Sequence, residues 1–380
     1  MTSRERLLIT LRGGIADRVP VAPFVQEEYL SYYYPLKTSV DRVIDATELA
    51  EELDFDLMAK HRGLEPPHWF RRSRPGWEIS RTSAVVAGFE QRRLEIVTPK
   101  RIFVREDARP YTGAGSAGGA FTPVKHLLGT QEEIECFLES SPPLDDEDRR
   151  EIQETVGAWK KILGERGVLA PWGFAGVFNF CADLIGMDNL YCAPYEDEDL
   201  YRLLMSGITE KCCEYNQSLV EAGADCISIQ GHMAGGRTTG PEFFREFVQP
   251  YEQKMLNAIH EAGGFSVYHN CGYARSLYDN YREMKMTVWE TISEPPRGDN
   301  NLAEAKQLLG ESICLLGNLD QVDFLKRATP AEVDARTRET VRAGKPGGRY
   351  IFSTSDYLEI GTPRENVVAM IEAAKDEGRY

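Results

Sequence analysis

Eight short apolar runs recur along the chain and alternate with segments whose apolar positions have helical spacing. Apolar runs that alternate with helices favour parallel strands buried on both faces. Right-handed crossovers between such strands close naturally into a barrel, so the pattern predicts one (β/α)₈ TIM barrel over residues 1–380. An open, doubly wound sheet is the alternative. The predicted strands are Val19–Phe24, Phe55–Ala59, Val168–Trp172, Cys226–Gln230, Phe265–His269, Met286–Glu290, Ile313–Gly317 and Tyr350–Thr354.

Two segments depart from this alternation. Before the first strand we expect extra N-terminal helices, the first over Thr2–Arg12, where leucines gather on one side. Between the second and third strands lie about a hundred residues, far more than a crossover needs. Polar and apolar residues partly alternate from Trp77 to Arg105, which predicts an antiparallel β meander inserted at about 75–125. The glycine-rich residues 111–120 lack the Lys-Ser/Thr ending of a phosphate loop, so we expect a mobile connection there.

Charge narrows the range of partners. The formal net charge of the 380 residues is −16, and an acidic surface repels phosphate backbones and anionic lipid. We therefore expect neither nucleic acid nor a membrane as a partner. The first residues carry no apolar signal segment, no stretch approaches a membrane span, and the eight cysteines lie mostly in apolar or helical segments. These features predict reduced thiols and a cytoplasmic protein.

The candidate chemistry lies directly after the predicted strands. In a barrel of this kind the carboxyl ends of the strands form the active face. His61 follows the second strand, and the aromatic residues after the third strand predict a pocket for a flat apolar substrate, although part of this set belongs to any core. The predicted substrate-binding residues are Glu27, Trp172, Phe174, Phe178 and Gln230.

His269 and Cys271 form the sharpest pair. Residues i and i+2 of an extended strand project to the same side, so an imidazole and a thiolate here can approach one ion together. Zinc accepts N and S donors and keeps an open position when it is catalytic. Asp356 is the predicted third metal ligand. The alternative is a packed histidine beside a buried free cysteine, with Asp356 an ordinary loop carboxylate.

Two further residues are candidates for acid–base catalysis. Glu290 ends the sixth predicted strand and is a candidate general acid or an alternative metal ligand; a simple salt bridge is the competing interpretation. His232, after the fourth strand, is a candidate proton donor or hydrogen-bonding partner of the substrate. An ordinary loop histidine is the competing interpretation there.

Motifs along nearly the whole chain resemble the uroporphyrinogen decarboxylase superfamily, which implies the barrel fold. They occur in the family's order and are specific only as a set. The motifs are Arg4-Glu-Arg-Leu-Leu, Asp17-Arg-Val-Pro-Val-Ala-Pro, Gly223-Ala-Asp with Ile229-Gln-Gly, Gly240-Pro-Glu-Phe-Phe-Arg-Glu-Phe-Val-Gln-Pro, Gly317-Asn-Leu-Asp and Gly361-Thr-Pro-Arg-Glu-Asn-Val.

Within that superfamily, His269-x-Cys271-Gly is similar to the corrinoid-dependent methyltransferase branch. The decarboxylases carry an arginine-rich segment after the first strand that holds substrate carboxylates, whereas this chain has Phe24-Val-Gln-Glu-Glu-Tyr there. The methyltransferases hold zinc with a His-x-Cys pair and a later cysteine. Asp356 stands nearest to that cysteine's place, which implies an oxygen ligand and a harder Lewis acid, or an altered or lost metal site.

The resemblance implies methyl transfer that involves a corrinoid. With a hard zinc site and an aromatic pocket, we expect a methyl group to pass from a methoxylated aromatic ether to the cobalt of a separate corrinoid protein. The alternative is transfer from a methyl-corrinoid protein to tetrahydrofolate or to a thiol such as coenzyme M. A decarboxylase and a non-catalytic corrinoid- or porphyrin-binding protein are further alternatives. No Asp-x-His-x-x-Gly motif for cobalt ligation occurs in the chain, so the corrinoid is expected on a partner protein.

Overall fold

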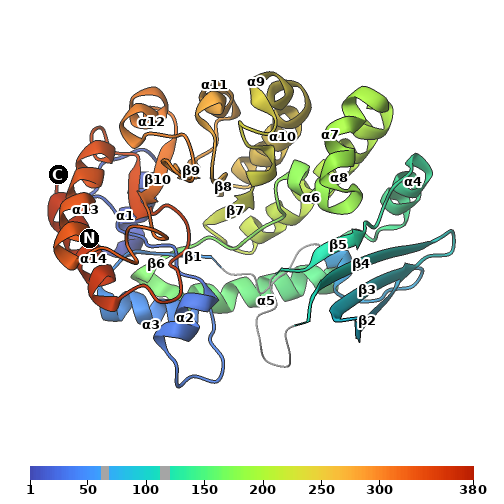
Figure 1. Cartoon of the computed structure of the whole chain (residues 1–380), viewed down its shortest axis with the longest axis horizontal. Helices are drawn as coiled ribbons and strands as arrows, with labels where there is room; N and C mark the ends of the chain where they lie inside the picture. The colour runs from blue at the N-terminus through green and yellow to red at the C-terminus, as the bar shows by residue number, and fades with distance from the viewer. Residues whose placement is uncertain (61–67, 112–119) are drawn as a thin grey trace.

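Parallel strands form the centre of the molecule (Figure 1). The computed structural model describes residues 1–60, 68–111 and 120–380, so His61 and most of the glycine-rich stretch lie outside the described residues. One parallel sheet has the order β11 (Tyr350–Thr354), β10 (Cys314–Leu319), β9 (Val288–Thr291), β8 (Phe265–His269) and β7 (Cys226–Gln230). A parallel pair, β1 (Leu57–Ala59) with β6 (Gly167–Leu169), forms a second sheet.

Backbone hydrogen bonds connect these two sheets on both sides. Val21, in the first predicted strand, forms a parallel bridge with Phe352 of β11. The Val21 carbonyl also accepts the N–H of Asp56, next to β1, at 2.7 Å. On the other side, the Leu169 carbonyl of β6 accepts the N–H of Asp225, next to β7, at 3.0 Å. Each of the eight predicted strand regions is thus hydrogen-bonded to two neighbours.

One buried apolar cluster contains a side chain from each of these eight regions. Leu7 and Leu11 of α1 (Ser3–Leu11) belong to the same cluster. Because Cys226, Val288 and Cys314 of the cluster are the first residues of their strands, α1 packs against the amino ends of the strands. A capping box between Thr2 and Glu5 fixes the start of this helix. The carboxyl ends therefore remain for the site.

Helices cover the outside of the parallel strands, and apolar residues between the two layers form the larger core cluster (Figure 1). Besides α1, the helices are α2 (Glu27–Tyr33), α3 (Ile44–Leu53), α4 (Gln131–Ser140), α5 (Asp146–Leu163), α6 (Val177–Ile185), α7 (Met187–Glu196), α8 (Glu198–Glu221), α9 (Gly240–Phe243), α10 (Gln249–Glu261), α11 (Tyr278–Met284), α12 (Leu302–Leu309), α13 (Pro330–Gly344) and α14 (Arg364–Glu377). Within the described residues, no helix combines the length and the apolar character that a bilayer-spanning segment requires.

An antiparallel sheet projects from one side of the molecule (Figure 1). It consists of β2 (Glu78–Val86), β3 (Phe89–Val97), β4 (Ile102–Pro110) and β5 (Thr122–Lys125), paired in chain order, so the predicted meander is confirmed. Buried Trp77 and Phe103 pack on Phe137 of α4, with ring centroids 5.7 and 5.8 Å away. Arg105 of β4 forms an ion pair with Asp183 of α6. These contacts hold the meander beside the parallel strands.

Candidate metal and active site

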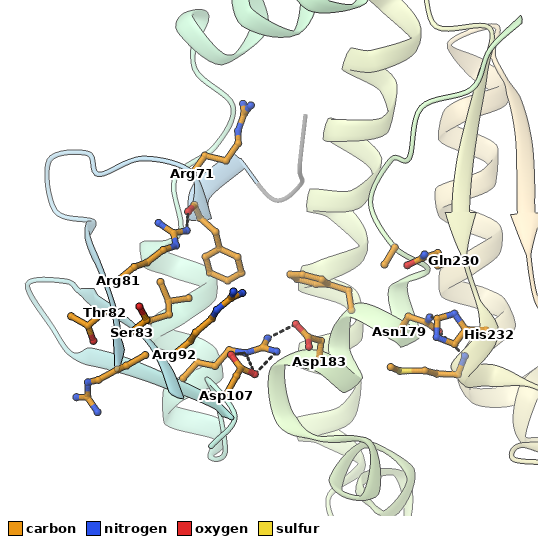
Figure 2. A pocket seen from close by; sticks show the side chains of 17 residues that line it. Arg71, Arg81, Thr82, Ser83, Arg92, Asp107, Asn179, Asp183, Gln230 and His232 are labelled. Carbon is orange, nitrogen blue, oxygen red and sulfur yellow. Dashed lines mark hydrogen bonds and ion pairs between the residues drawn. The ribbon is translucent and has the colours of Figure 1, made fainter. Parts of the chain in front are cut away.

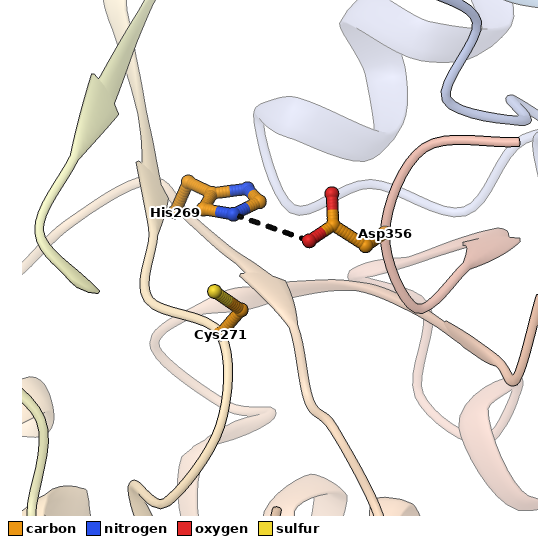
Figure 3. A group of neighbouring side chains, drawn as sticks. All are labelled: His269, Cys271 and Asp356. Carbon is orange, nitrogen blue, oxygen red and sulfur yellow. Dashed lines mark ion pairs between the residues drawn. The ribbon is translucent and has the colours of Figure 1, made fainter. Parts of the chain in front are cut away.

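Three side chains from two strand ends converge on one point (Figure 3). His269 is the last residue of β8, Cys271 follows it by two residues, and Asp356 lies just after β11. One potential ligand atom from each residue lies within 4.8 Å of the other two. The His269 Nε2 and an Asp356 carboxylate oxygen are 3.8 Å apart. An imidazole nitrogen, a sulfur and a carboxylate oxygen at this spacing fit the donor set that zinc prefers.

A buried carboxylate fixes the orientation of the His269 ring. The Nδ1 atom of His269 and a Glu290 carboxylate oxygen are hydrogen-bonded at 2.9 Å. The Nε2 atom is thus left to face Cys271 and Asp356, which together with His269 form the donor cluster. The other Glu290 oxygen forms an ion pair with Lys60. Both side chains of this pair are almost fully buried, with 2% of Lys60 and 1% of Glu290 exposed. A carboxylate on the outer nitrogen of a ligating histidine is a recurrent feature of metal sites.

Glu290 is not free to act as a general acid. Burial alone would raise its pKa, but Lys60 and His269 outweigh burial and lower the pKa of Glu290 to about 2. Both of its oxygens are engaged, and it does not line the cavity described below. These contacts fit the salt-bridge interpretation, with a positioning role for Glu290 behind His269, better than the predicted acid role.

The surroundings of His269 and Asp356 also shift the pKa values of these two side chains. Burial lowers the pKa of His269, but the hydrogen bonds with Cys271 and Glu290 outweigh it and raise the pKa to about 10. Burial raises the pKa of Asp356, and the nearby His269 opposes that shift. In the absence of a metal, the donor cluster therefore holds a proton on His269, which a bound cation would have to displace.

The donor cluster opens into a cavity of about 440 Å³. Of the predicted site residues, the structure brings Trp172, Gln230, His232, His269, Cys271 and Asp356 together in its lining. Phe24 joins them, with its ring centroid 6.2 Å from both the Trp172 and the His269 rings. The indole N–H of Trp172 is buried and has no hydrogen-bond acceptor among the described residues. The cavity thus offers an aromatic wall and one free donor next to the candidate ligands.

Three predicted substrate-binding residues lie elsewhere. Glu27 begins α2, is 54% exposed at its side chain and forms an ion pair with Arg42, outside the cavity lining. Phe174 and Phe178 are 0% exposed and pack into the core, against Trp69 and Tyr191 among others. The structure does not place these three residues in the cavity lining: Glu27 lies on the exposed side of α2, and the chain turns after Trp172 and directs the rings of Phe174 and Phe178 inward. Of the aromatic residues predicted to bind substrate after the third strand, only Trp172 lines this cavity within the described residues.

A substitution of Phe174 tests whether this residue belongs to the core or to the substrate site. We expect Phe174→Ala to lower the free energy of unfolding by about 3–5 kcal/mol, because it leaves a cavity in a packed core. Chemical denaturation measures this loss, and KM of the folded variant should stay unchanged. A raised KM with wild-type stability would restore Phe174 to the substrate site.

Asn179 of α6 contacts His232 and selects which ring nitrogen of the neutral imidazole carries the proton. Its side-chain oxygen accepts the backbone N–H of Met233 at 3.1 Å, so its amide nitrogen is the group that faces His232 Nδ1, at 3.3 Å. Burial lowers the pKa of His232, with a further contribution from His269, and favours the neutral ring. If Nδ1 accepts from Asn179, the neutral ring carries its proton on Nε2. His232 is then a hydrogen-bond donor at the cavity wall, not a free base.

A buried carboxylate supports the start of the helix that carries Asn179. Glu252 is fully buried and accepts the backbone N–H of Phe178 at 3.2 Å. Burial raises the pKa of Glu252 from 4.5 to about 7, against hydrogen bonds from two α6 N–H groups. Because its folded pKa is raised, Glu252 favours the folded state at low pH, and this contribution is lost as the pH rises from about 4.5 through 7.

Glu252→Gln should therefore change the pH dependence of stability. We expect the difference in free energy of unfolding, variant minus wild type, to increase by about 3 kcal/mol from pH 4 to pH 8. Denaturation at a series of pH values measures the difference, with Glu261→Gln, an exposed position on α10, as the control. A difference that is constant with pH would contradict the prediction.

Lys60, Asn179 and Phe24 are the residues of the site that sequence reasoning missed. A signal existed for Lys60, since a lysine that directly follows a buried strand lies on the same face as the other strand-end residues. For Asn179, only the spatial contact between α6 and the loop after β7 shows the link to His232. Phe24 ends the first predicted strand and differs in no way from a core residue in the sequence.

Comparison with known proteins agrees with the resemblance in the sequence. The profile of the uroporphyrinogen decarboxylase (URO-D) family matches residues 123–377. A Methanosarcina mazei protein named methylcobamide:CoM methyltransferase MtbA is 29% identical over 387 residues, which cover 99% of this chain and 98% of that protein. A uroporphyrinogen decarboxylase of Geobacter sulfurreducens is 24% identical and covers 65% of this chain and 71% of its own length.

Among solved structures, one described as a methyltransferase from Methanosarcina mazei shares the fold. It has a TM-score of 0.70 and 18% identity, and the superposition covers 99% of each chain. The family profile extends over more than half of the sequence and includes β6 to β11 and the loops after them, which contain His269, Cys271 and Asp356. This chain belongs to the uroporphyrinogen decarboxylase family.

Proposed function

We propose that this protein is a corrinoid-dependent methyltransferase that transfers a methyl group from a methyl-corrinoid partner protein to a small thiol of the coenzyme M type. The observation that carries this proposal is the His269, Cys271 and Asp356 donor cluster at an open cavity. The full-length relative named as a methylcobamide:CoM methyltransferase supports the direction of transfer and the thiol acceptor. The sequence contains no Asp-x-His-x-x-Gly motif for cobalt ligation, which supports a methyl-corrinoid substrate carried on a separate protein.

The aromatic-ether substrate is not part of this proposal. That expectation depended on Asp356 and on an aromatic pocket formed by residues from Trp172 to Phe180. Trp172 and Asp356 line the cavity, but Phe174 and Phe178 are buried in the core. The relatives whose names specify a methyl acceptor are coenzyme M methyltransferases. Both findings favour the thiol alternative over demethylation of a methoxyarene.

We also infer that one closed (β/α)₈ barrel, forming a single domain, carries the site. The hydrogen bonds that join the first predicted strand to β11 and β1, and β6 to β7, support closure. The buried cluster to which all eight regions contribute supports the same conclusion. Such a barrel explains why residues from the ends of β6, β7, β8 and β11 meet at one cavity.

In the proposed reaction the acceptor loses its thiol proton, its sulfur forms a bond to the methyl carbon, and the electron pair of the cobalt–carbon bond stays on cobalt. A zinc ion held by His269, Cys271 and Asp356 would supply Lewis acidity that favours the thiolate form of the acceptor. Glu290 keeps the His269 ring in place. Trp172 and Phe24 wall the cavity against water, and the His232 Nε2–H group orients the anionic acceptor.

A direct assay tests this proposal. Methylcob(III)alamin and coenzyme M are mixed with the protein, and the appearance of cob(I)alamin is followed by its absorption under anaerobic conditions. We expect turnover with the wild type and a loss of about 100-fold or more with His269→Ala. Equal rates for both proteins would refute a role for the donor cluster. Turnover with tetrahydrofolate and none with coenzyme M would replace the thiol acceptor.

A further inference from the structure

A second, larger cleft lies between the antiparallel meander and α6 (Figure 2). Its volume is about 1140 Å³. Among the described residues that line it are five arginines and no lysine, in a chain whose net charge is −16. A guanidinium group presents a planar fork of N–H donors, which suits two-point binding of carboxylate, sulfonate or phosphate better than an ammonium group does. The arginines are Arg71, Arg81, Arg92, Arg93 and Arg105.

Part of this cluster has a structural task. Arg105 forms ion pairs with Asp107 of its own strand and with Asp183 of α6, across the cleft. Arg93 is held by Glu95 and by Glu106 on the neighbouring strand. These pairs fix the meander relative to α6 and give the cleft a defined shape, but they leave little charge for a ligand.

Arg81 and Arg92 are the arginines with charge to offer. Arg81 donates to the Phe70 carbonyl, and no ion pair of Arg81 is found within the described residues. The Arg92 side chain is 56% exposed, and its guanidinium group lies 3.8 Å from a Glu90 carboxylate oxygen, which is a long distance for an ion pair. Its guanidinium carbon lies 3.8 Å from the centroid of the Phe121 ring, which holds the group in place without neutralising it. Thr82 and Ser83 also line the cleft, and their hydroxyl groups add further hydrogen-bond donors.

The cleft adjoins the candidate metal site. Gln230 and His232 line both the arginine cleft and the smaller cavity that contains His269 and Cys271. Figure 2 shows Arg81 and Arg92 on the meander side and Gln230 and His232 on the opposite side. A ligand bound at the arginines would therefore lie next to the cavity that contains the donor cluster.

We propose that the arginine cleft binds a small organic polyanion, whose two or more carboxylate, sulfonate or phosphate groups contact Arg81 and Arg92. A concave cleft of this volume suits a drug-sized molecule, whereas protein partners dock on broader and flatter surfaces. The same cleft exceeds what a two-carbon thiol fills. Binding of a polyanion in this cleft does not depend on the proposed function or on the identity of the methyl acceptor.

Calorimetric titration tests the binding with three probes, 1,2,3-propanetricarboxylate, tripolyphosphate and the monoanion propionate. We expect saturable binding of at least one polyanion, and weak or no binding of propionate. The double variant Arg81→Gln/Arg92→Gln should bind that polyanion about tenfold or more weakly. A matched control, Lys100→Gln/Lys125→Gln, removes the same charge from the meander module outside the cleft lining and should bind as the wild type does.

The outcomes separate this inference from the proposed function. Cys271→Ala should retain polyanion binding even though it lacks a metal ligand, so the inference survives if methyl transfer is disproved. Equal affinity in both double variants, or no saturable binding of either polyanion, would overturn it. Weaker association of a corrinoid protein with Arg81→Gln/Arg92→Gln, without any change for the polyanions, would also overturn it and assign the cleft to protein docking.

Discussion

Replacing Cys271 with alanine is expected to prevent metal binding at the proposed zinc site and to lower the proposed methyl transfer by at least about 100-fold. Cys271 supplies the one sulfur of the donor cluster, and His269 with Asp356 would then offer only two ligands. Two ligands hold zinc far more weakly than three, so both the metal content and the rate should fall together.

Cys192→Ala is the matched control for this experiment. Cys192 is an exposed free cysteine on α7, away from the donor cluster. We expect wild-type metal content and rate, measured by elemental analysis and by the cob(I)alamin assay. A Cys271→Ala protein that keeps both its metal and its activity would show that sulfur is not a ligand here.

Replacing Lys60 with methionine should have the second-largest effect, on stability and on function together. The change leaves the buried Glu290 with only His269 as its charged partner. Breaking a buried ion pair from one side costs about 3–5 kcal/mol of unfolding free energy. Because Glu290 orients His269, metal affinity should also fall by about 10- to 100-fold. Denaturation and competition with a chelator measure the two effects.

The double variant Lys60→Met/Glu290→Gln separates the effect of leaving Glu290 unpaired from the effect of altered packing in the core. It removes both charges, so we expect it to be more stable than Lys60→Met alone. Its metal affinity should nonetheless stay low, since the carboxylate behind His269 is gone. A Lys60→Met protein within about 0.5 kcal/mol of the wild type would contradict the importance of this pair.

The parallel strands were the most predictable part of the fold. The bounds of β7, β8 and β11 coincide with the predicted runs, because a strand buried on both faces is apolar along its whole length. β1 and β6 are shorter than predicted, since the hydrogen-bonded ladder between them covers three residues of each strand. The meander was also predictable, because its partial alternation of polar and apolar residues survives in the paired strands.

The candidate site was predictable only where strand geometry controls the side chain. His269 and Cys271 project together from one strand end, and the end of β11 brings Asp356 to them. After Trp172 the chain passes through a short irregular segment into α6, whose residues are almost all buried, so the sequence could not tell which aromatic ring would face the cavity. Glu290 was found from the sequence, but its contact with Lys60 could not be predicted, because Lys60 lies 230 positions away in the sequence.

Metal analysis of the untreated wild-type protein tests the central claim most directly. Purified without chelator, the protein should contain close to one equivalent of zinc, and removal of that zinc should abolish methyl transfer from methylcob(III)alamin to coenzyme M until zinc is restored. A metal-free preparation that transfers methyl groups at the full rate would contradict the account.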